Sequence, residues 1–314
     1  MTRCLYCYQP LHSDEKDFHS SCCKKIFGQS EVPVLPYRED QFEDLATEII
    51  KTSASVTGVQ SKISLHLGKG NKDEATKRFT LVGLWGAYIL KPPSKNYPQL
   101  PEVEDLTMHL AQIAKIKVVP HSLIRLQSGN LAYITKRIDR EKNRKLHMED
   151  MCQLTERLTE DKYNGSYEQI AKAINKYSIY PGLDVVSFCE IVLFSFLTGN
   201  ADMHLKNFSL FEQSNSGMAL SPAYDLLATA IVNPTDDEDL ALTLNGKKKK
   251  IIRDDFLAAF STIKLEEKQQ LNIFNKMTNA KQSWIETVRI SFLTNEFKLK
   301  FIELIEDRFE RLGL

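Results

Sequence analysis

The chain has 314 residues, of which 42% are hydrophobic and 26% are charged. Its 41 Lys and Arg residues balance its 41 Asp and Glu residues, so bulk charge gives no reason to expect binding to nucleic acid or to an anionic membrane. The most apolar run, residues 185–197, is too short to span a bilayer and contains Glu190. With no apolar leader at the N-terminus, we expect a soluble, cytoplasmic protein with no membrane partner.

Four of the six cysteines lie near the N-terminus. Cys4-x2-Cys7 followed by His19-x2-Cys22 has the spacing of a zinc knuckle, and Cys23 is an alternative to Cys22. Because four protein ligands leave no open position, a zinc ion held here would be structural. The competing interpretation is a metal-free head whose cysteines pack as small apolar groups.

The first half of the chain alternates helical and extended patterns. Apolar residues recur at helical spacing in residues 40–51 and again in residues 102–115. Residues 55–91 predict strands around a polar hairpin, with Lys91 at the end of an apolar strand. Residues 117–137 predict two further strands joined by a Ser-Gly-Asn turn.

From residue 147 onward the pattern is mainly helical. Residues 167–177 and 185–197 are the clearest helices, a mixed loop region covers residues 199–229, and residues 254–312 are helical again. A strand-rich front and a helix-rich back indicate an α+β, bilobal fold with a cleft between two lobes.

We therefore divide the chain into three parts. These are a Cys/His-rich head over residues 1–30, a strand-rich N-lobe over residues 31–140, and a helical C-lobe over residues 141–314.

The strongest chemical signal is the run GNADMHLKN. Its Asp202 and Asn207 have the D-x-x-x-x-N spacing of a protein-kinase catalytic loop. A carboxylate there orients the attacking hydroxyl and accepts its proton, and an amide oxygen a few residues later can hold Mg²⁺. Asp225, in the run SPAYDLL, has the place of a second magnesium-binding carboxylate.

Three elements further upstream complete the pattern. Lys91 can reach the α- and β-phosphates of ATP, and an acidic residue at the start of the next helix should hold it. Glu102 and Glu104 both open that helix, and we favour Glu104. The run SVTGVQSK, whose single glycine is Gly58, has backbone amides that could cover phosphates. Each element alone has an ordinary explanation as a turn or a solvated strand end, but their order together favours a phosphoryl-transfer site.

Six runs of this sequence resemble the HipA family of serine/threonine kinases. They are SVTGVQSKISL, YILKPPSKNYPQLPEVEDLTMHLA, AYITKRIDR, LHMEDMCQL, GNADMHLKNFSL and SPAYDLL. The resemblance covers most of residues 55–230 and implies a protein-kinase-like fold that uses ATP and Mg²⁺. It implies Asp202 as the catalytic base, Asn207 and Asp225 as magnesium ligands, and Lys91 as the phosphate-binding lysine.

The resemblance also implies roles for residues around the nucleotide. Lys136, Arg137, Ile138 and Asp139 would form the hinge near the adenine, although Ile138 stands where an aromatic residue is more usual. His204 would face the phosphates.

In kinases of this family a serine in the Gly-containing loop is autophosphorylated, and the loop then blocks ATP binding. The matching position is Ser55, and Thr57 matches a second phosphorylated position in shorter relatives. A phosphate at either residue would add nearly two negative charges beside the ATP phosphates, which gives a physical reason for inhibition.

The short N-terminal head resembles HipT, the kinase of three-gene toxin–antitoxin systems. The resemblance implies a HipS-like antitoxin, a HipB-like DNA-binding protein through which DNA is bound indirectly, and an aminoacyl-tRNA synthetase as substrate.

Two other interpretations remain open. One is a kinase-like regulator that binds nucleotide or a partner without turnover. The other is a zinc-ribbon nucleic-acid module, against which the neutral charge counts, since the only basic run is Lys247–Lys250 beside an Asn-Gly turn signal.

Overall fold

The computed structural model describes residues 2–39, 41, 62–68, 77–82, 86–141, 144–213 and 217–314. Backbone contacts divide the chain into two units. The first unit comprises Met1–Asp105 and Val119–Ile138, and the second comprises Leu106–Val118 and Asp139–Leu314.

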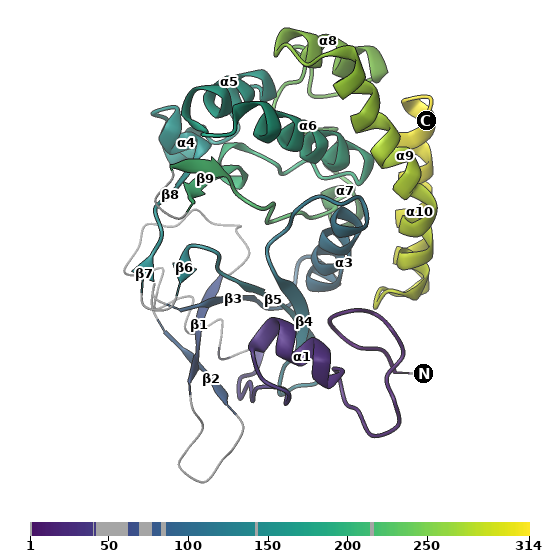
Figure 1. Cartoon of the computed structure of the whole chain (residues 1–314). Helices are drawn as coiled ribbons and strands as arrows, with labels where there is room; N and C mark the ends of the chain where they lie inside the picture. The colour runs from purple at the N-terminus through teal and green to yellow at the C-terminus, as the bar shows by residue number, and fades with distance from the viewer. Residues whose placement is uncertain are drawn as a thin grey trace. The chain divides into compact units, whose positions relative to one another are not determined.

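The first unit is built on a five-stranded antiparallel sheet (Figure 1). The strand order is β2-β1-β3-β5-β4, so β4 lies at one edge. The strands are β1 (Ile63–Gly68), β2 (Arg78–Leu81), β3 (Tyr88–Lys91), β4 (His121–Arg125) and β5 (Leu131–Lys136). The two strands and the turn expected within residues 117–137 are confirmed as β4, β5 and the turn at Gly129, where φ is +96°.

Helix α1 (Ser20–Phe27) packs against this sheet. The ring of Phe27 contacts the rings of Phe79 on β2 and Tyr88 on β3, at centroid distances of 5.8 and 6.2 Å. The hydroxyl of Tyr88 donates a hydrogen bond of 3.0 Å to the carbonyl of Ile26. The head and the sheet therefore share one apolar core within the first unit.

Helix α3 (Leu100–Ile113) begins in the first unit and ends in the second. It matches the helix expected over residues 102–115. Val103, Leu106 and Leu110 recur at helical spacing and are fully buried.

The second unit is mainly helical and carries two small antiparallel sheets, β10-β9-β8 and β6-β7. Its helices are α4 (Met151–Leu154), η1 (Thr159–Asp161), α5 (Tyr167–Tyr177), α6 (Pro181–Leu197), η2 (Leu205–Asn207), α7 (Thr229–Val232), α8 (Arg253–Thr262), α9 (Glu267–Ile290) and α10 (Asn295–Arg311). Its strands are β6 (Arg140–Glu141), β7 (Arg144–Lys145), β8 (Met148–Asp150), β9 (Ser209–Glu212) and β10 (Met218–Leu220).

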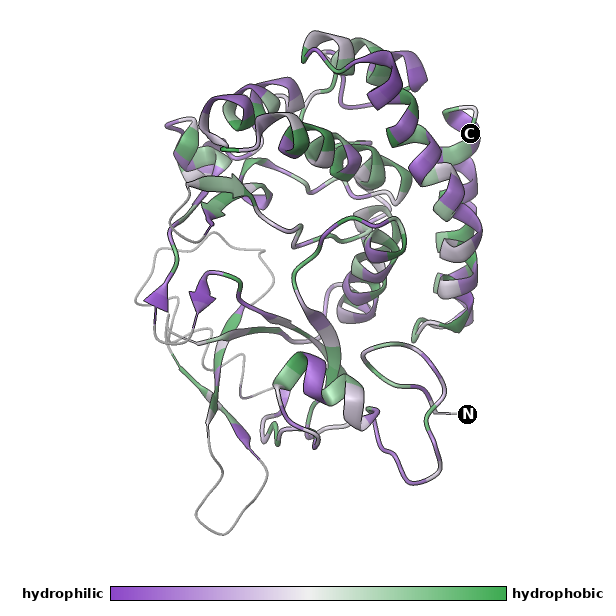
Figure 2. Ribbon diagram, in the orientation of Figure 1, coloured by the Kyte–Doolittle hydropathy of each residue, from purple (hydrophilic) through white to green (hydrophobic). Residues whose placement is uncertain are grey.

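Helix α6 is the centre of the second unit. Ten of the thirteen residues from Val185 to Leu197 are buried, and α5, α9 and α10 pack around the helix. Phe194 meets Trp284 of α9 and Phe196 meets Phe256 of α8, both edge to face. Figure 2 shows α6 as hydrophobic along most of its length, whereas α9 and α10 each have one hydrophilic face. This difference is expected for a central helix among peripheral ones.

Local sequence explains where these helices begin. The Ser166 side chain accepts from the backbone N–H of Gln169 while the Gln169 side chain accepts from the Ser166 N–H, so a capping box starts α5. Helix α6 begins at Pro181, one turn before the expected Val185, because proline is favoured in the first turn of a helix. None of the helices in the described parts of the chain is long and apolar enough to cross a membrane.

Some expectations fall outside the described residues. These are the helix over residues 40–51, apart from Gln41, most of the polar hairpin after Gly68, and the loop that contains Ser55, Thr57 and Gly58.

Candidate functional site

A buried ion pair joins the last residue of β3 to the first turns of α3. The Nζ atom of Lys91 lies 2.5 Å from Oε1 of Glu104, and the two residues are only 4% and 1% exposed. The lysine Nζ also lies 5.3 Å from the ring centroid of Tyr133, its cross-strand neighbour on β5. A lone buried charge is strongly unfavourable, so each charge here depends on the other.

Glu102, the other acidic residue at the start of α3, has a different environment. Burial, followed by the charge of Asp105, raises the pKa of Glu102 to about 7. The structure thus brings Lys91 together with Glu104, the residue favoured from the sequence, and not with Glu102.

Asp105, directly after Glu104, is held by two groups from distant parts of the first unit. The hydroxyl of Tyr8 donates to Asp105 Oδ2 at 2.8 Å, and His121 Nδ1 lies 2.7 Å from Oδ1. All three residues are almost completely buried. Sequence reasoning did not identify this group, since its members come from the head, α3 and β4.

In the second unit, the chain turns sharply after α6. Gly199 has a φ of +66°, and a Cβ added there would lie 2.7 Å from Leu304 and 2.9 Å from Ala230. Only glycine satisfies both the left-handed backbone and the close approach. The side chain of Asn200 then accepts from the N–H of Asp202 at 3.1 Å, which orders the start of the loop.

The loop presents Asp202 and Asn207 together. The Nδ2 group of Asn207 donates to the backbone carbonyl of Asp202 at 2.8 Å, and that carbonyl also accepts from the N–H of His204. Since the carbonyl can only accept, the Asn207 amide is oriented with Oδ1 as the oxygen that a cation would meet. The Asp202 carboxylate is about half exposed, with 45% of its side-chain surface accessible.

The Asp202 carboxylate accepts a hydrogen bond from a tyrosine. The hydroxyl of Tyr163 donates to Asp202 Oδ1 at 2.5 Å, and its ring meets the His204 ring edge to face at 5.0 Å. Burial, followed by the hydrogen bond to Asp202, raises the pKa of Tyr163 well above its usual value. Tyr163 was missed from the sequence because nothing in the pattern 39 residues before Asp202 distinguishes it.

His204 is buried beside this group. Burial lowers its pKa, and the nearby Asp202 charge acts in the opposite direction. Its Nδ1 atom has no hydrogen-bond partner among the described residues. Because buried polar atoms usually have a hydrogen-bond partner, this nitrogen is available to a polar ligand that binds at the loop.

Asp225 adopts an uncommon backbone conformation, with a φ of +55°. Its neighbour Tyr224 holds this segment in place, because the Tyr224 hydroxyl lies 2.5 Å from Ser209 Oγ and donates to the carbonyl of Lys206. A non-glycine residue in the left-handed region is strained, and such residues concentrate at functional sites.

The expected hinge lies where the chain passes from one unit to the other, between Ile138 and Asp139. The backbone N–H of Lys136 donates to Pro120 and that of Arg137 donates to Ala87. Asp139 is buried and forms an ion pair with Arg140. The adenine-binding role of this segment stays a prediction.

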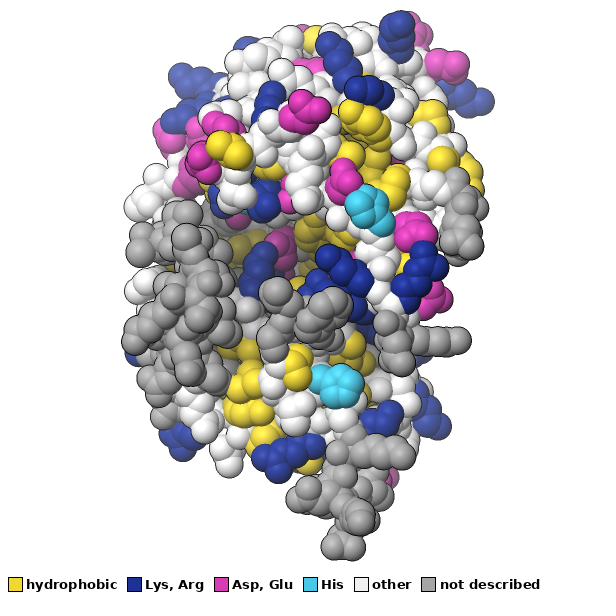
Figure 3. Space-filling view, turned by 90° about the vertical axis from the view of Figure 1, so that its left-hand side faces the viewer, with side chains coloured by type: hydrophobic (Ala, Val, Ile, Leu, Met, Phe, Trp, Pro, Cys, Tyr) yellow, Lys and Arg dark blue, Asp and Glu magenta, His cyan; other side chains and the backbone are white. Residues whose placement is uncertain are grey.

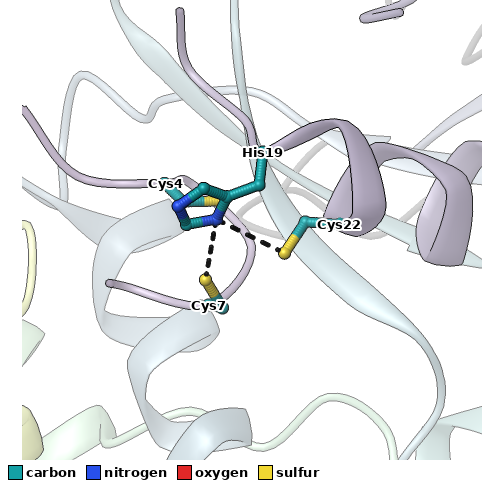
Figure 4. Close-up of side chains that lie close together, drawn as sticks. All are labelled: Cys4, Cys7, His19 and Cys22. Atoms are coloured by element: carbon teal, nitrogen blue, oxygen red, sulfur yellow. Dashed lines mark hydrogen bonds between the residues drawn. The ribbon is translucent and has the colours of Figure 1, made fainter. Parts of the chain in front are cut away.

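The proposed zinc ligands converge within the first unit (Figure 4). The cluster contains Cys4, Cys7, His19 and Cys22, whose candidate ligand atoms all lie within 4.8 Å of one another. Cys23 is buried but is not part of it.

The basic run at Lys247–Lys250 follows a tight turn at Asn245 and Gly246, as its sequence predicts. Three of its four lysines form ion pairs with acidic neighbours. The ion pairs are Lys247–Asp255, Lys248–Glu238 and Lys249–Asp237. Figure 3 likewise shows basic and acidic side chains interspersed over the visible face of the second unit. This arrangement does not resemble a nucleic-acid-binding surface.

Solved structures identify the fold as an α+β, protein-kinase-like one. The HipA chain of a Shewanella oneidensis complex of HipA, HipB and operator DNA superposes with a TM-score of 0.70 at 21% identity, covering 90% of this chain and 72% of that one. The Helicobacter pylori proinflammatory kinase CtkA superposes with a TM-score of 0.56 at 15% identity, covering 80% of this chain and 93% of that one. The fold class expected from the sequence is confirmed.

The chain belongs to the HipA-like C-terminal domain family, whose model matches residues 54–285. A predicted kinase of Sinorhizobium fredii, Y4dM, is 32% identical over 227 residues, covering 68% of this chain and 54% of that protein. The serine/threonine-protein kinase toxin HipA of Shewanella oneidensis is 27% identical over 217 residues, covering 63% and 48%. The chain thus spans about half the length of the curated relatives that it matches.

Proposed function

We propose that this chain is a serine/threonine protein kinase that uses ATP and Mg²⁺ and acts as a toxin. The observation that carries the proposal is the Lys91–Glu104 ion pair. A lysine at the end of β3 paired with a glutamate on the following helix is the arrangement that active protein kinases require. Membership of a family that includes a kinase toxin supports the same activity.

The residues of the second unit suit the remaining roles. Asp202 has an accessible carboxylate that already accepts a hydroxyl, so it can orient and deprotonate a substrate hydroxyl. Asn207 Oδ1 and the Asp225 carboxylate supply the oxygen donors that Mg²⁺ prefers. When bound, the ion would neutralise charge on the phosphates, and Lys91 would bind the α- and β-phosphates.

Phosphate transfer from γ-labelled ATP with Mg²⁺ tests this activity. We expect label on the chain itself or on a candidate substrate, and no label with Asp202→Asn. Asp254→Asn is the matched control, because it removes an exposed carboxylate at the start of α8. Equal labelling by Asp202→Asn and the unmodified chain would rule out Asp202 as the base.

We further propose regulation and partners like those of HipT. The chain would phosphorylate an aminoacyl-tRNA synthetase, autophosphorylate Ser55 or Thr57 in the loop containing Gly58, and bind a HipS-like antitoxin. The resemblance of the sequence supports these proposals. A HipB-like partner has additional support, since the similar Shewanella HipA is solved with HipB and operator DNA. Mass spectrometry of the purified chain with and without ATP identifies the modified residue.

A kinase-like regulator without turnover is the second candidate. The observation that favours it is the hydrogen bond from the Tyr163 hydroxyl to Asp202 Oδ1, which takes one of the two oxygens of the carboxylate that would bind a substrate hydroxyl. Tight Mg²⁺-dependent ATP binding without transfer to any protein would support this candidate over the kinase.

A further inference from the structure

The N-terminal cluster has the dimensions of a tetrahedral metal site. His19 Nδ1 lies 3.4 Å from Cys7 Sγ and 3.7 Å from Cys22 Sγ. In a tetrahedral zinc site the metal–ligand bond lengths place nitrogen and sulfur ligands about 3.6 Å apart. Cys4 completes the set, and its Sγ lies behind the imidazole ring in the view of Figure 4.

The second nitrogen of His19 has the partner that a metal-binding histidine needs. His19 Nε2 lies 2.9 Å from the carbonyl oxygen of Pro10. Because a carbonyl only accepts, Nε2 carries the hydrogen and the Nδ1 lone pair faces the sulfurs. Such a hydrogen bond fixes the orientation and tautomer of histidine ligands in metal sites.

The ligand set selects zinc and a structural role. Three thiolates and one imidazole in a tetrahedral arrangement are typical of structural zinc, and four protein ligands leave no position for a substrate or water. Cys22 and Cys23 both belong to α1, but only Cys22 faces the cluster.

The residues that follow two of the ligands attach the head to the rest of the first unit. Leu5, after Cys4, accepts through its carbonyl from the N–H of Leu123 and the hydroxyl of Ser122, both on the edge strand β4. Tyr8, after Cys7, binds Asp105 on α3. The conformation of the cluster therefore determines where Leu5 meets the sheet and where Tyr8 meets helix α3.

We propose that Cys4, Cys7, His19 and Cys22 bind one structural zinc ion, and that this ion fixes the start of α3 through Tyr8 and Asp105. Asp105 follows Glu104, so the position of the Lys91–Glu104 pair depends on the zinc-bound head. The metal site stands by itself. Only the significance of the ion pair for phosphate transfer rests on the proposed function.

Elemental analysis of the purified full-length chain, expressed with zinc in the medium, tests the metal site. We expect one zinc per chain, and replacement by Co²⁺ should give the visible spectrum of a tetrahedral cobalt–thiolate centre. Cys7→Ser, at a half-buried position, should lose both signals. Cys23→Ala should keep them, because it alters the neighbouring buried cysteine on the same helix outside the cluster. Iron in place of zinc, or no metal together with no cobalt spectrum, would overturn the proposal.

Hydrogen exchange tests the connection to α3 without requiring kinase activity. Removing zinc with a chelator should speed exchange at the amide of Leu123, which donates to Leu5, and at Val103 in the start of α3, while α9 stays unchanged. Tyr8→Phe should keep the zinc and speed exchange at Val103 alone. Unchanged exchange at Val103 in the chelated protein and in Tyr8→Phe would overturn this part of the proposal, whatever the phosphate-transfer assay shows.

Discussion

Tyr163 donates a hydrogen bond of 2.5 Å to Oδ1 of Asp202, the carboxylate that we assign as the catalytic base. The tyrosine is held from two further sides, because its ring packs edge to face on His204 and the Nζ atom of Lys162 lies 4.9 Å from its centroid. A donor fixed in this way orients Asp202 and leaves Oδ2 for the substrate hydroxyl. We therefore regard Tyr163 as a positioning residue.

Tyr163→Phe should lower kcat about tenfold, since a hydrogen bond to a charged group contributes roughly 1.5–3 kcal/mol and a tenfold rate corresponds to about 1.4 kcal/mol. The KM for ATP should stay unchanged, because the hydroxyl contacts only the base. Steady-state kinetics measure both constants, and Tyr180→Phe, an exposed tyrosine, serves as the control. A rise in kcat/KM for the protein substrate would instead identify the Tyr163 hydroxyl as a competitor of the substrate.

Contacts that arise from local sequence could be predicted, and contacts between distant segments could not. Helix α5 runs over Tyr167–Tyr177 as expected, because a capping box and an apolar face both lie within the segment. Lys91 and Glu104 are only 13 residues apart, at the ends of a strand and a helix start that the pattern indicates. The Tyr8–Asp105 bond joins residues 97 apart and leaves no periodic signal. The same is true of Tyr163 and Asp202.

The Lys91–Glu104 pair should contribute to stability as well as to phosphate transfer. Glu104→Gln leaves a buried ammonium without its carboxylate, which should destabilise the fold by about 3–5 kcal/mol in urea unfolding. The double variant Lys91→Met, Glu104→Leu should be less destabilised than Glu104→Gln, because no charge remains buried.

Both variants should lose phosphate transfer. The double variant should therefore be inactive although it is more stable than Glu104→Gln. Glu303→Gln, which alters an exposed glutamate on α10, should change neither property. If the double variant proved as unstable as Glu104→Gln, packing rather than charge would explain the loss.

A second ion pair gives the stability a pH dependence. Glu190 on α6 lies 2.6 Å from Lys276 on α9. Burial raises the pKa of Glu190 above its ordinary 4.5, although Lys276 acts in the opposite direction. The folded state therefore holds this proton more tightly than the unfolded state, so the contribution of Glu190 is largest below 4.5 and is lost as pH rises through the folded-state pKa.

Chemical unfolding between about pH 4.5 and about pH 8 measures this effect. Glu190→Gln should remove the contribution of Glu190 to the slope of unfolding free energy against pH. The variant should therefore gain stability relative to the unmodified chain as pH rises. Lys276→Met removes the opposing charge, which should raise the pKa of Glu190 further and make the slope steeper. Identical slopes in all three proteins would show that Glu190 does not titrate in this range.

Asp225 allows metal binding to be separated from backbone strain. Asparagine tolerates the left-handed conformation at least as well as aspartate, so Asp225→Asn should keep the free energy of unfolding within about 0.5 kcal/mol. The variant loses a carboxylate oxygen for Mg²⁺, and we expect Mg²⁺-dependent ATP affinity to fall about a hundredfold, roughly 2.7 kcal/mol. Calorimetric titration of ATP with and without Mg²⁺ measures the difference. Unchanged Mg²⁺-dependent affinity would exclude Asp225 as a ligand, whereas a large loss of stability would mean that its carboxylate is needed for the turn itself.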